Sequence, residues 1–240
     1  DWQTQSEEEK DSARMAIRIY HNLDSSERLY VTSGKNQFYQ VEKVIPSLSK
    51  GIEIFERKGV NPWYAQSILL IESPGKIAYS NVGAFGPFQL MKSVARTYGL
   101  TINRSVDERK DFEKSAVAAS KLISKSCIPS AKLILNRNEI EYNENDLWFK
   151  LFVLHIYHAG AGNVGGLIDN LKPKNGGLEL IQLMWQSEYG GFKNASQNYS
   201  QVALASNLIL EELLYSQCSS IYKCTPLIEE SDQNMSHVQD

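Results

Sequence analysis

Apolar residues recur along most of the chain at the three- and four-residue spacing of amphipathic helices. Ser6 followed by three glutamates is a helix-start signal, which predicts a helix to about Asn22. Pro62 suits the first turn of a helix that continues through Ile71 and stops at the Pro74-Gly75 breaker pair. Further helical segments are predicted at about 38–57, with a break or kink near Pro46, and at 88–98, 111–125, 147–158, 178–188 and 197–215, with a short one ending near Leu171. The pattern predicts a mainly α fold.

Glycine, proline and small polar residues mark the segments between these helices. Residues 75–87 are expected to form a loop or a short hairpin, residues 136–146 a loop, and the polar end from about Pro226 a disordered tail. We find no internal repeat and no linker that separates two domains. The predicted organisation is an N-terminal helical extension over residues 1–60 packed on the core, a catalytic domain over 61–215, and a partly disordered tail over 216–240.

Composition restricts the class of protein more than it identifies a partner. The 240 residues are 42% hydrophobic and 22% charged, with a formal net charge of −3, which excludes full disorder, collagen and a dense disulfide scaffold. No uncharged apolar stretch approaches the roughly 18 residues of a membrane helix. Residues 61–200 carry 15 Lys/Arg and 12 Asp/Glu, whereas residues 201–240 carry one Lys and six acids. Without a clustered basic face or a nucleotide-binding loop, we expect neither nucleic acid nor nucleotide as a partner.

The three cysteines do not have the spacing of a zinc site, and the four histidines do not cluster with them. We therefore expect no metal and no other cofactor. Cys218 and Cys224 lie six residues apart just after a predicted helix, close enough to close a small loop. A disulfide between them and three free buried thiols are both compatible with this spacing.

Glu72 is the first candidate for chemistry. It ends an apolar helix immediately before a Ser-Pro-Gly break, where partial desolvation would raise its pKa and suit it to general acid catalysis. A helix-terminal Glu exposed to water is the alternative. The 34 residues from Ser73 to Val106 contain no Asp or Glu but are rich in polar uncharged and aromatic residues, which suit a sugar chain. Because the nearest downstream acids are Asp107 and Glu108, a single-acid mechanism fits better than the usual two-carboxylate one.

Four motifs then resemble soluble lytic transglycosylases and the related goose-type lysozymes, glycoside hydrolase family 23. They are Glu72-Ser73; Ser80-x-x-Gly83-Ala84-x-Gly86 with Gln89-x-Met91; Tyr157-x-Ala159-Gly160-x-Gly162-x-Val164; and Asn198-Tyr199. Tyr98-Gly99-Leu100, and Asp107-Glu108-Arg109-x-Asp111 before an Ala-rich helix, resemble the branch of membrane-bound lytic transglycosylase D. The motifs occur in the family's order over about residues 62–210.

The resemblance implies a lysozyme-like helical domain, with a small loop or hairpin region beside a cleft, that cleaves the β-1,4 bond between N-acetylmuramic acid and N-acetylglucosamine in peptidoglycan. Glu72 would act first as acid and then as base, and Tyr199 would orient it by hydrogen bonding. The expected substrate-binding residues are Ser80, Gln89, Met91, Tyr157, His158, Phe88 and Lys76. Core packing is an alternative for Met91, Tyr157 and His158, and an ion-pair loop that braces the cleft is the favoured reading of residues 107–109.

Several positions depart from the family's pattern in the segments that are expected to contact the substrate. Pro74-Gly75-Lys76 stands where Phe-Asn-Pro is usual and places a cation near the cleft, and Pro87-Phe88 precedes Gln89. Lys92 replaces a proline, and His158 replaces the asparagine of the Ala-Tyr-Asn-Ala-Gly segment. Since Glu72, Gln89 and Tyr199 are retained, these departures favour altered substrate preference over loss of activity.

The sequence thus predicts a lysozyme or a lytic transglycosylase and leaves these two open. Its sequence pI near 5.9 contrasts with strongly basic wall lysozymes and suggests a preference for de-N-acetylated peptidoglycan, whose free amines are cationic. The alternatives are an inactive glycan-binding or wall-assembly protein and an intracellular helical scaffold. A chain that begins at Asp1 is compatible with a removed signal peptide or with trimming, and we expect an exported monomer, periplasmic or secreted.

Overall fold

The computed structural model describes residues 2–27, 29, 44–72, 80, 83–216, 218–220 and 223–224. It divides into a small unit, residues 1–36, and a larger unit, residues 37–240. Because α2 (Ile45–Arg57) packs on α3 (Trp63–Glu72) and α5 (Phe112–Leu122), it is part of the larger unit. This division groups α2 with the larger unit, while the boundaries expected from the sequence, at residues 60 and 215, stay a prediction.

The small unit consists of the short helix η1 (Trp2–Thr4) and α1 (Glu7–His21). Ser6 and Glu9 form a reciprocal capping box at the start of α1, in which each side chain accepts a hydrogen bond from the other's main chain. Asn22 ends the helix in the left-handed conformation, with φ of 52°. These two caps confirm the helix predicted from Ser6 to about Asn22.

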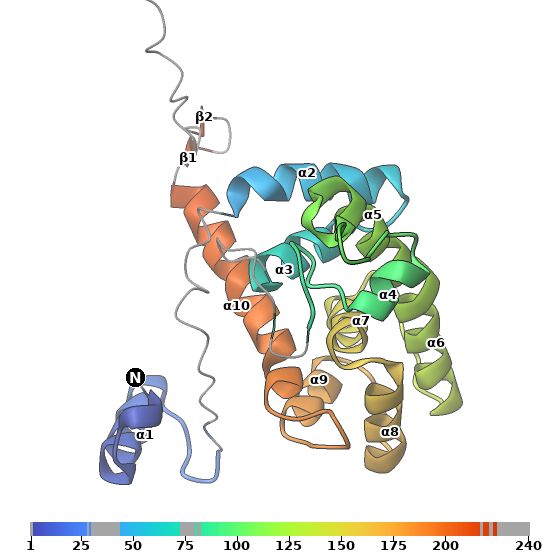
Figure 1. The fold of residues 1–240 in the computed structure, drawn as a ribbon. Helices are drawn as coiled ribbons and strands as arrows, with labels where there is room; N and C mark the ends of the chain where they lie inside the picture. The colour runs from blue at the N-terminus through green and yellow to red at the C-terminus, as the bar shows by residue number, and fades with distance from the viewer. Residues whose placement is uncertain are drawn as a thin grey trace, which may run out of the picture. The chain divides into compact units, whose positions relative to one another are not determined.

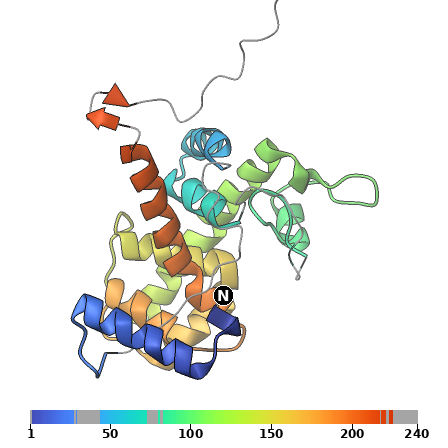
Figure 2. The same cartoon turned by 90° about the vertical axis from the view of Figure 1, so that its left-hand side faces the viewer.

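The larger unit is mainly helical, as predicted (Figure 1). Its helices are α2 (Ile45–Arg57), α3 (Trp63–Glu72), α4 (Lys92–Thr97), η3 (Glu108–Lys110), α5 (Phe112–Leu122), η4 (Ile123–Cys127), α6 (Ile128–Arg137), α7 (Leu147–Ala159), α8 (Ala161–Leu171), α9 (Leu178–Trp185) and α10 (Ala195–Ser216). Figure 2 shows α10 running along this unit and leading into two short antiparallel strands, β1 (Cys218–Ser220) and β2 (Lys223–Cys224).

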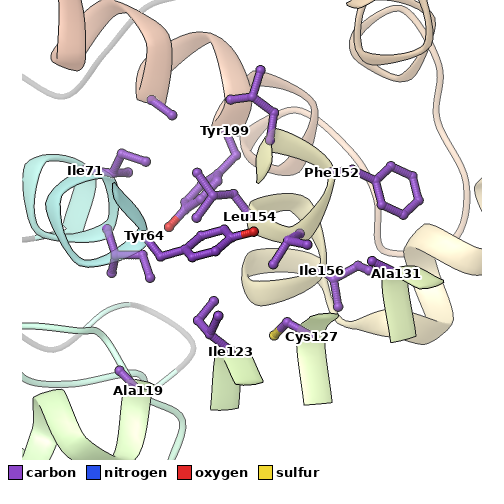
Figure 3. Packing of buried hydrophobic residues seen from close by; sticks show 14 of the residues in the cluster. Tyr64, Ile71, Ala119, Ile123, Cys127, Ala131, Phe152, Leu154, Ile156 and Tyr199 are labelled. Atoms are coloured by element: carbon purple, nitrogen blue, oxygen red, sulfur yellow. The ribbon is translucent and has the colours of Figure 1, made fainter. Parts of the chain in front are cut away.

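The core forms around α7, which packs between α10, α8, α9 and α6. Residues 148–149 and 151–156 of this helix are buried and only Lys150 between them is partly exposed, so the helix is buried around most of its circumference, as a central helix must be. Side chains from α3, α7, α10 and η4 meet at the centre of the cluster in Figure 3. Gly51 of α2 allows close packing on α3, because a Cβ at this position would lie 2.6 Å from Leu69 Cδ1. This core fixes the ends of α3 and α10 relative to each other.

The predicted helix over 111–125 continues much further, because α5, η4 and α6 follow one another without a break to Arg137. The join is a π-helical turn in which the Ile128 N–H bonds to the carbonyl of Ile123, five residues earlier. Pro129 follows directly and has no N–H to offer. The wider turn accommodates a proline that would disrupt a regular α-helix at this point.

The segment around residue 88 differs from its prediction. Instead of a helix over 88–98, residues 85–90 form a turn closed by main-chain hydrogen bonds between Phe85 and Leu90, and α4 begins only at Lys92. Gly86 and Gln89 adopt φ of 85° and 44°, which no helix allows. The predicted stop at Pro74-Gly75, most of the 75–87 loop, Lys76 and the tail from Pro226 lie outside the described residues.

Two further predictions concern the ends of the fold. The main chains of Cys218 and Cys224 pair across the β1–β2 ladder, while a disulfide between them stays a prediction. In the described part of the chain, no helix combines the length and the apolar character needed to cross a membrane.

Candidate active site

Glu72 is the last residue of α3, and it is partly exposed while the seven residues Tyr64–Ala65 and Ser67–Ile71 before it are buried. The apolar helix anchors the chain up to this point, and the carboxylate is the first group to leave the core. The Tyr199 hydroxyl on α10 donates a hydrogen bond of 2.9 Å to Glu72 Oε1. Figure 3 shows Tyr199 reaching from α10 toward α3. The structure therefore brings together the two residues that the sequence placed at the centre of the chemistry.

Tyr199 acts in this pair as a neutral donor. It is buried, with 3% of its surface exposed. Burial, and then the nearby Glu72 carboxylate, raise the pKa of Tyr199 well above its usual value. The phenol therefore keeps its proton at physiological pH and holds the Glu72 carboxylate in one orientation.

Tyr157 connects α7 to the 85–90 turn near Glu72. Its hydroxyl, on α7, donates a hydrogen bond of 2.6 Å to the carbonyl oxygen of Phe88. Burial raises the pKa of Tyr157 well above its usual value, and the Glu72 carboxylate adds to the effect. Tyr157 thus lies close enough to Glu72 to feel its charge and also fixes the 85–90 turn beside it.

A buried arginine also braces this turn. Arg109, 2% exposed, donates hydrogen bonds of 2.9 Å to the carbonyls of Gly83 and Leu90 and forms an ion pair of 2.7 Å with Asp107. Gly86 packs so closely that a Cβ there would overlap the carbonyl oxygen of Arg109. The arrangement agrees with the bracing ion-pair loop predicted for residues 107–109.

Three of the predicted sugar-binding residues lie in this turn or next to it. Gln89 is partly exposed, and its amide donates a hydrogen bond of 3.0 Å to the carbonyl of Gly86. The Ser80 Oγ accepts a hydrogen bond of 2.9 Å from the Ala84 N–H, which gives the loop before the turn its shape. Met91 is 40% exposed at the start of α4. These side chains lie at the surface or at its edge.

Phe88 requires a correction. Its side chain is completely buried, stacked on Phe55 with ring centroids 5.8 Å apart and packed against Phe112 at the same separation. A ring in this position belongs to the core and does not present a face to a saccharide. Its contribution to the site is its main-chain carbonyl, which receives the Tyr157 hydroxyl.

His158 lies at the site but contacts Tyr199 directly. The two rings stack with centroids 4.5 Å apart and an angle of 29°. His158 Nδ1 also lies 3.2 Å from the Ser196 hydroxyl at the start of α10. The sequence does not predict these contacts. Its one signal at His158 is that a histidine stands where the family has an asparagine. The exposed ring covers Tyr199 and helps to fix it under Glu72.

Among the described residues, no group of three or more His, Cys, Asp or Glu side chains could hold a metal ion. The one buried thiol in this part, Cys127, is free, and burial raises its pKa to about 12, so it is not a nucleophile at neutral pH. The arrangement can transfer protons through Glu72 beside a partly exposed, polar turn.

A search among curated proteins finds no match to the chain. The family model of the transglycosylase SLT domain matches residues 52–176, just over half of the chain. The matched stretch includes Glu72, Gln89 and Tyr157, and Tyr199 lies beyond it. Membership indicates peptidoglycan lytic transglycosylase activity in general and agrees with the lysozyme-like, mainly helical fold. The chain belongs to the transglycosylase SLT domain family.

Proposed function

We propose that this protein cleaves the β-1,4 bond between N-acetylmuramic acid and N-acetylglucosamine in peptidoglycan, with Glu72 as its single catalytic carboxyl group. The hydrogen bond from Tyr199 to Glu72 carries the proposal, because it links residues 127 positions apart in an oriented pair at the core's edge. Family membership supplies the substrate class.

Glu72 donates its proton to the leaving glycosidic oxygen as the bond from that oxygen to C1 of the muramyl residue breaks. The carboxylate then takes the proton of the muramyl 6-hydroxyl while that oxygen bonds to C1. This closes a 1,6-anhydro ring and returns Glu72 to its acid form without consuming water. In a lysozyme reaction, the carboxylate would instead activate a water molecule, and the product would carry a reducing end.

The charges near the site support a single-acid reaction. Asp107 is paired with the buried Arg109 at 2.7 Å, and Glu108 is paired with Lys114. The two downstream acids nearest in sequence to Glu72 are thus engaged in the bracing loop. A nucleophile supplied by the substrate removes the need for a second catalytic carboxylate.

Gln89, Ser80, Met91 and His158 are the side chains that we propose to contact the sugars, together with Lys76. Tyr157 contributes by fixing the 85–90 turn, which carries Gln89 and leads into Met91. Phe88 is not included, because its side chain is buried.

The test is digestion of purified sacculi followed by mass spectrometry of the soluble muropeptides. We expect the wild-type protein to release anhydro products, one water lighter than reducing-end products, and Glu72→Gln to lose at least about 100-fold in rate. Glu56→Gln, an exposed glutamate on α2, is the matched control and should retain full activity. Reducing-end products would identify a lysozyme, and binding without any product would identify an inactive glycan-binding protein.

We extend the proposal to the acetylation state of the glycan and to where the enzyme acts. A net charge of −3 does not oppose strands whose glucosamine amines are cationic, so de-N-acetylated glycan is the proposed preferred substrate. Because this polymer lies outside the cytoplasm, the proposed location is the periplasm or the medium, and the proposed active form is a monomer. Sacculi compared before and after chemical N-acetylation test the preference, and equal rates would refute it.

A further inference from the structure

A hollow lies beside the turn that carries Gln89, since Gly83 before the turn and Met91 after it both line this hollow. It is an open depression of about 720 Å³, formed by Gly83, residues 91–93 and 96 at the start of α4, and residues 102–107, 109 and 110. Its size exceeds that of a single side chain or ion and suits a short peptide segment. The depression is therefore a candidate binding surface separate from Glu72.

The depression is cationic. Lys92, Arg96, Arg104 and Lys110 line it, and none of the four forms a salt bridge within the described part of the chain. Asp107 is the one acid in the lining, and its charge is balanced by Arg109 at 2.7 Å. Four positive charges thus face one hollow with no acid paired to them there, which favours an anionic ligand.

The frame that carries these charges is ordered. Arg96 Nε and one terminal nitrogen donate to the carbonyl of Ile102 at 3.2 and 2.6 Å. The Asn103 side-chain oxygen accepts hydrogen bonds from the Ser105 and Val106 N–H groups at 2.9 and 2.8 Å. These bonds fix the loop in a single shape, so a ligand would meet preplaced cations and lose less free energy in ordering them.

The depression and the candidate active site share one turn. Met91 and Gly83 line the depression. Between them in sequence, the Phe88 carbonyl receives the hydroxyl of Tyr157, which lies close enough to Glu72 to be affected by its charge. Arg109 lies beneath, bound to the carbonyls of Gly83 and Leu90. A substrate group bound next to Gln89 can therefore reach the cations beside this turn.

We propose that this depression binds the free carboxylates of the peptide attached to the muramyl residue of the substrate, an inference that rests on the proposed function. The peptide starts at the sugar whose bond is cleaved, and an extended chain advances about 3.3 to 3.6 Å per residue. A short peptide that starts at a sugar beside Gln89 can therefore extend to the cations, because Met91, two positions further on, already lines the depression. Met91 and Val106, both partly exposed, lie beside the cations for the aliphatic parts of the peptide.

The experiment compares two substrates, soluble glycan strands with intact peptides and the same strands after an amidase has removed the peptides. The variant is Arg104→Gln with Lys110→Gln, because no side-chain hydrogen bond is formed by either residue within the described ranges. We expect its KM to rise about three- to tenfold on peptide-bearing strands and less than twofold on peptide-free strands. The matched control is Lys58→Gln with Lys125→Gln, two exposed lysines outside the depression, and should change neither KM.

The outcomes separate this inference from the proposed function. Cleavage of neither substrate by the wild-type protein would refute the proposed function itself. If the wild-type protein cleaved both substrates with equal KM, or if the variant's KM rose equally on both, peptide recognition would be refuted while the glycan reaction stayed intact. A rise in the variant's KM that appears only on strands bearing a phosphate polymer would assign the depression to that polymer and overturn the inference.

Discussion

The phenol of Tyr199, on α10, donates a hydrogen bond of 2.9 Å to the carboxylate of Glu72, at the end of α3. The exposed ring of His158 stacks on Tyr199 and so covers the donor from the solvent side. Neither α3 nor α10 could hold this pair alone, because the two groups come from distant segments that meet through the direct packing of α10 on α3 and of both helices on α7. The orientation of the candidate acid is thus a property of the whole core.

Tyr199→Phe removes this hydrogen bond and keeps the ring that His158 covers. A hydrogen bond to a charged group contributes about 1.5 to 3 kcal/mol, so we expect kcat on sacculi to fall roughly 10- to 150-fold. KM should change little, since the hydroxyl is buried beneath the carboxylate. Steady-state rates of muropeptide release measure both constants.

Tyr142→Phe is the control for this substitution, because Tyr142 packs on Phe149 away from Glu72. It should leave kcat unchanged. If Tyr199→Phe also retained its full kcat, Tyr199 would not position the acid.

Tyr157→Phe tests the bond between α7 and the 85–90 turn. Loss of the 2.6 Å hydrogen bond leaves the Phe88 carbonyl without that donor, which should reduce the free energy of unfolding by about 1 to 2 kcal/mol. Because the turn carries Gln89, KM should rise severalfold at the same time. Urea unfolding and steady-state kinetics on the same preparation measure the two effects.

Tyr64→Phe provides the comparison, since Tyr64 is also buried but its hydroxyl forms no hydrogen bond within the described ranges. Its KM should equal that of the wild type. A rise in KM for Tyr64→Phe, or none for Tyr157→Phe, would contradict this role of the turn.

The sequence was informative where local chemistry decides structure. The end of α3 at Glu72 follows from an apolar run that meets a Ser-Pro-Gly break, and α1 follows from the cap at Ser6. The partnership of Glu72 with Tyr199 was available only through the resemblance to a family, because 127 residues separate the two. Periodicity carries no information on which helix ends meet.

The turn at 85–90 shows where local signals mislead. Phe88, Leu90 and the residues after them have helical spacing, but positive φ at Gly86 and Gln89 prevents a helix. That conformation is stabilised by Arg109, 19 residues beyond Leu90, through contacts that no local pattern encodes. For the same reason Phe88, which the sequence suggested as a sugar platform, is required by the core.

Gly86→Ala should be among the more damaging single substitutions in this region. A methyl group at φ of 85° is strained, and it would also overlap the carbonyl oxygen of Arg109. Strain and overlap together should cost more than about 2 kcal/mol of stability and should displace the turn. The midpoint temperature of thermal unfolding and the rate of sacculus digestion should both fall.

Gly99→Ala separates the two causes, because Gly99 has φ of 96° with nothing within 4 Å of the added Cβ. Its cost should be near 1 kcal/mol, from backbone strain alone. Equal costs at the two positions would show that the close approach to Arg109 does not matter.

His155 should make the fold sensitive to acid. Its ring is completely buried against Phe192, and burial lowers its pKa to about 3, with a further contribution from His158. The main chain of Ser196 opposes this shift only in part, because neither ring nitrogen forms a hydrogen bond of good geometry within the described part of the chain. In the unfolded chain this histidine has a pKa near 6.5 and binds a proton that it does not bind in the folded state.

This difference in proton binding sets how the free energy of unfolding depends on pH. The contribution of His155 is fully present above pH 6.5 and is lost progressively as the pH falls toward 3, by about 2 kcal/mol between pH 7 and pH 5. His155→Leu, which keeps a buried side chain of similar size without a titratable group, should lose about 2 kcal/mol less than the wild type over that interval. Urea unfolding at the two pH values measures the difference, and His21→Gln, an exposed histidine on α1, should behave as the wild type does. An identical loss in His155→Leu and in the wild type would mean that other groups cause the acid sensitivity.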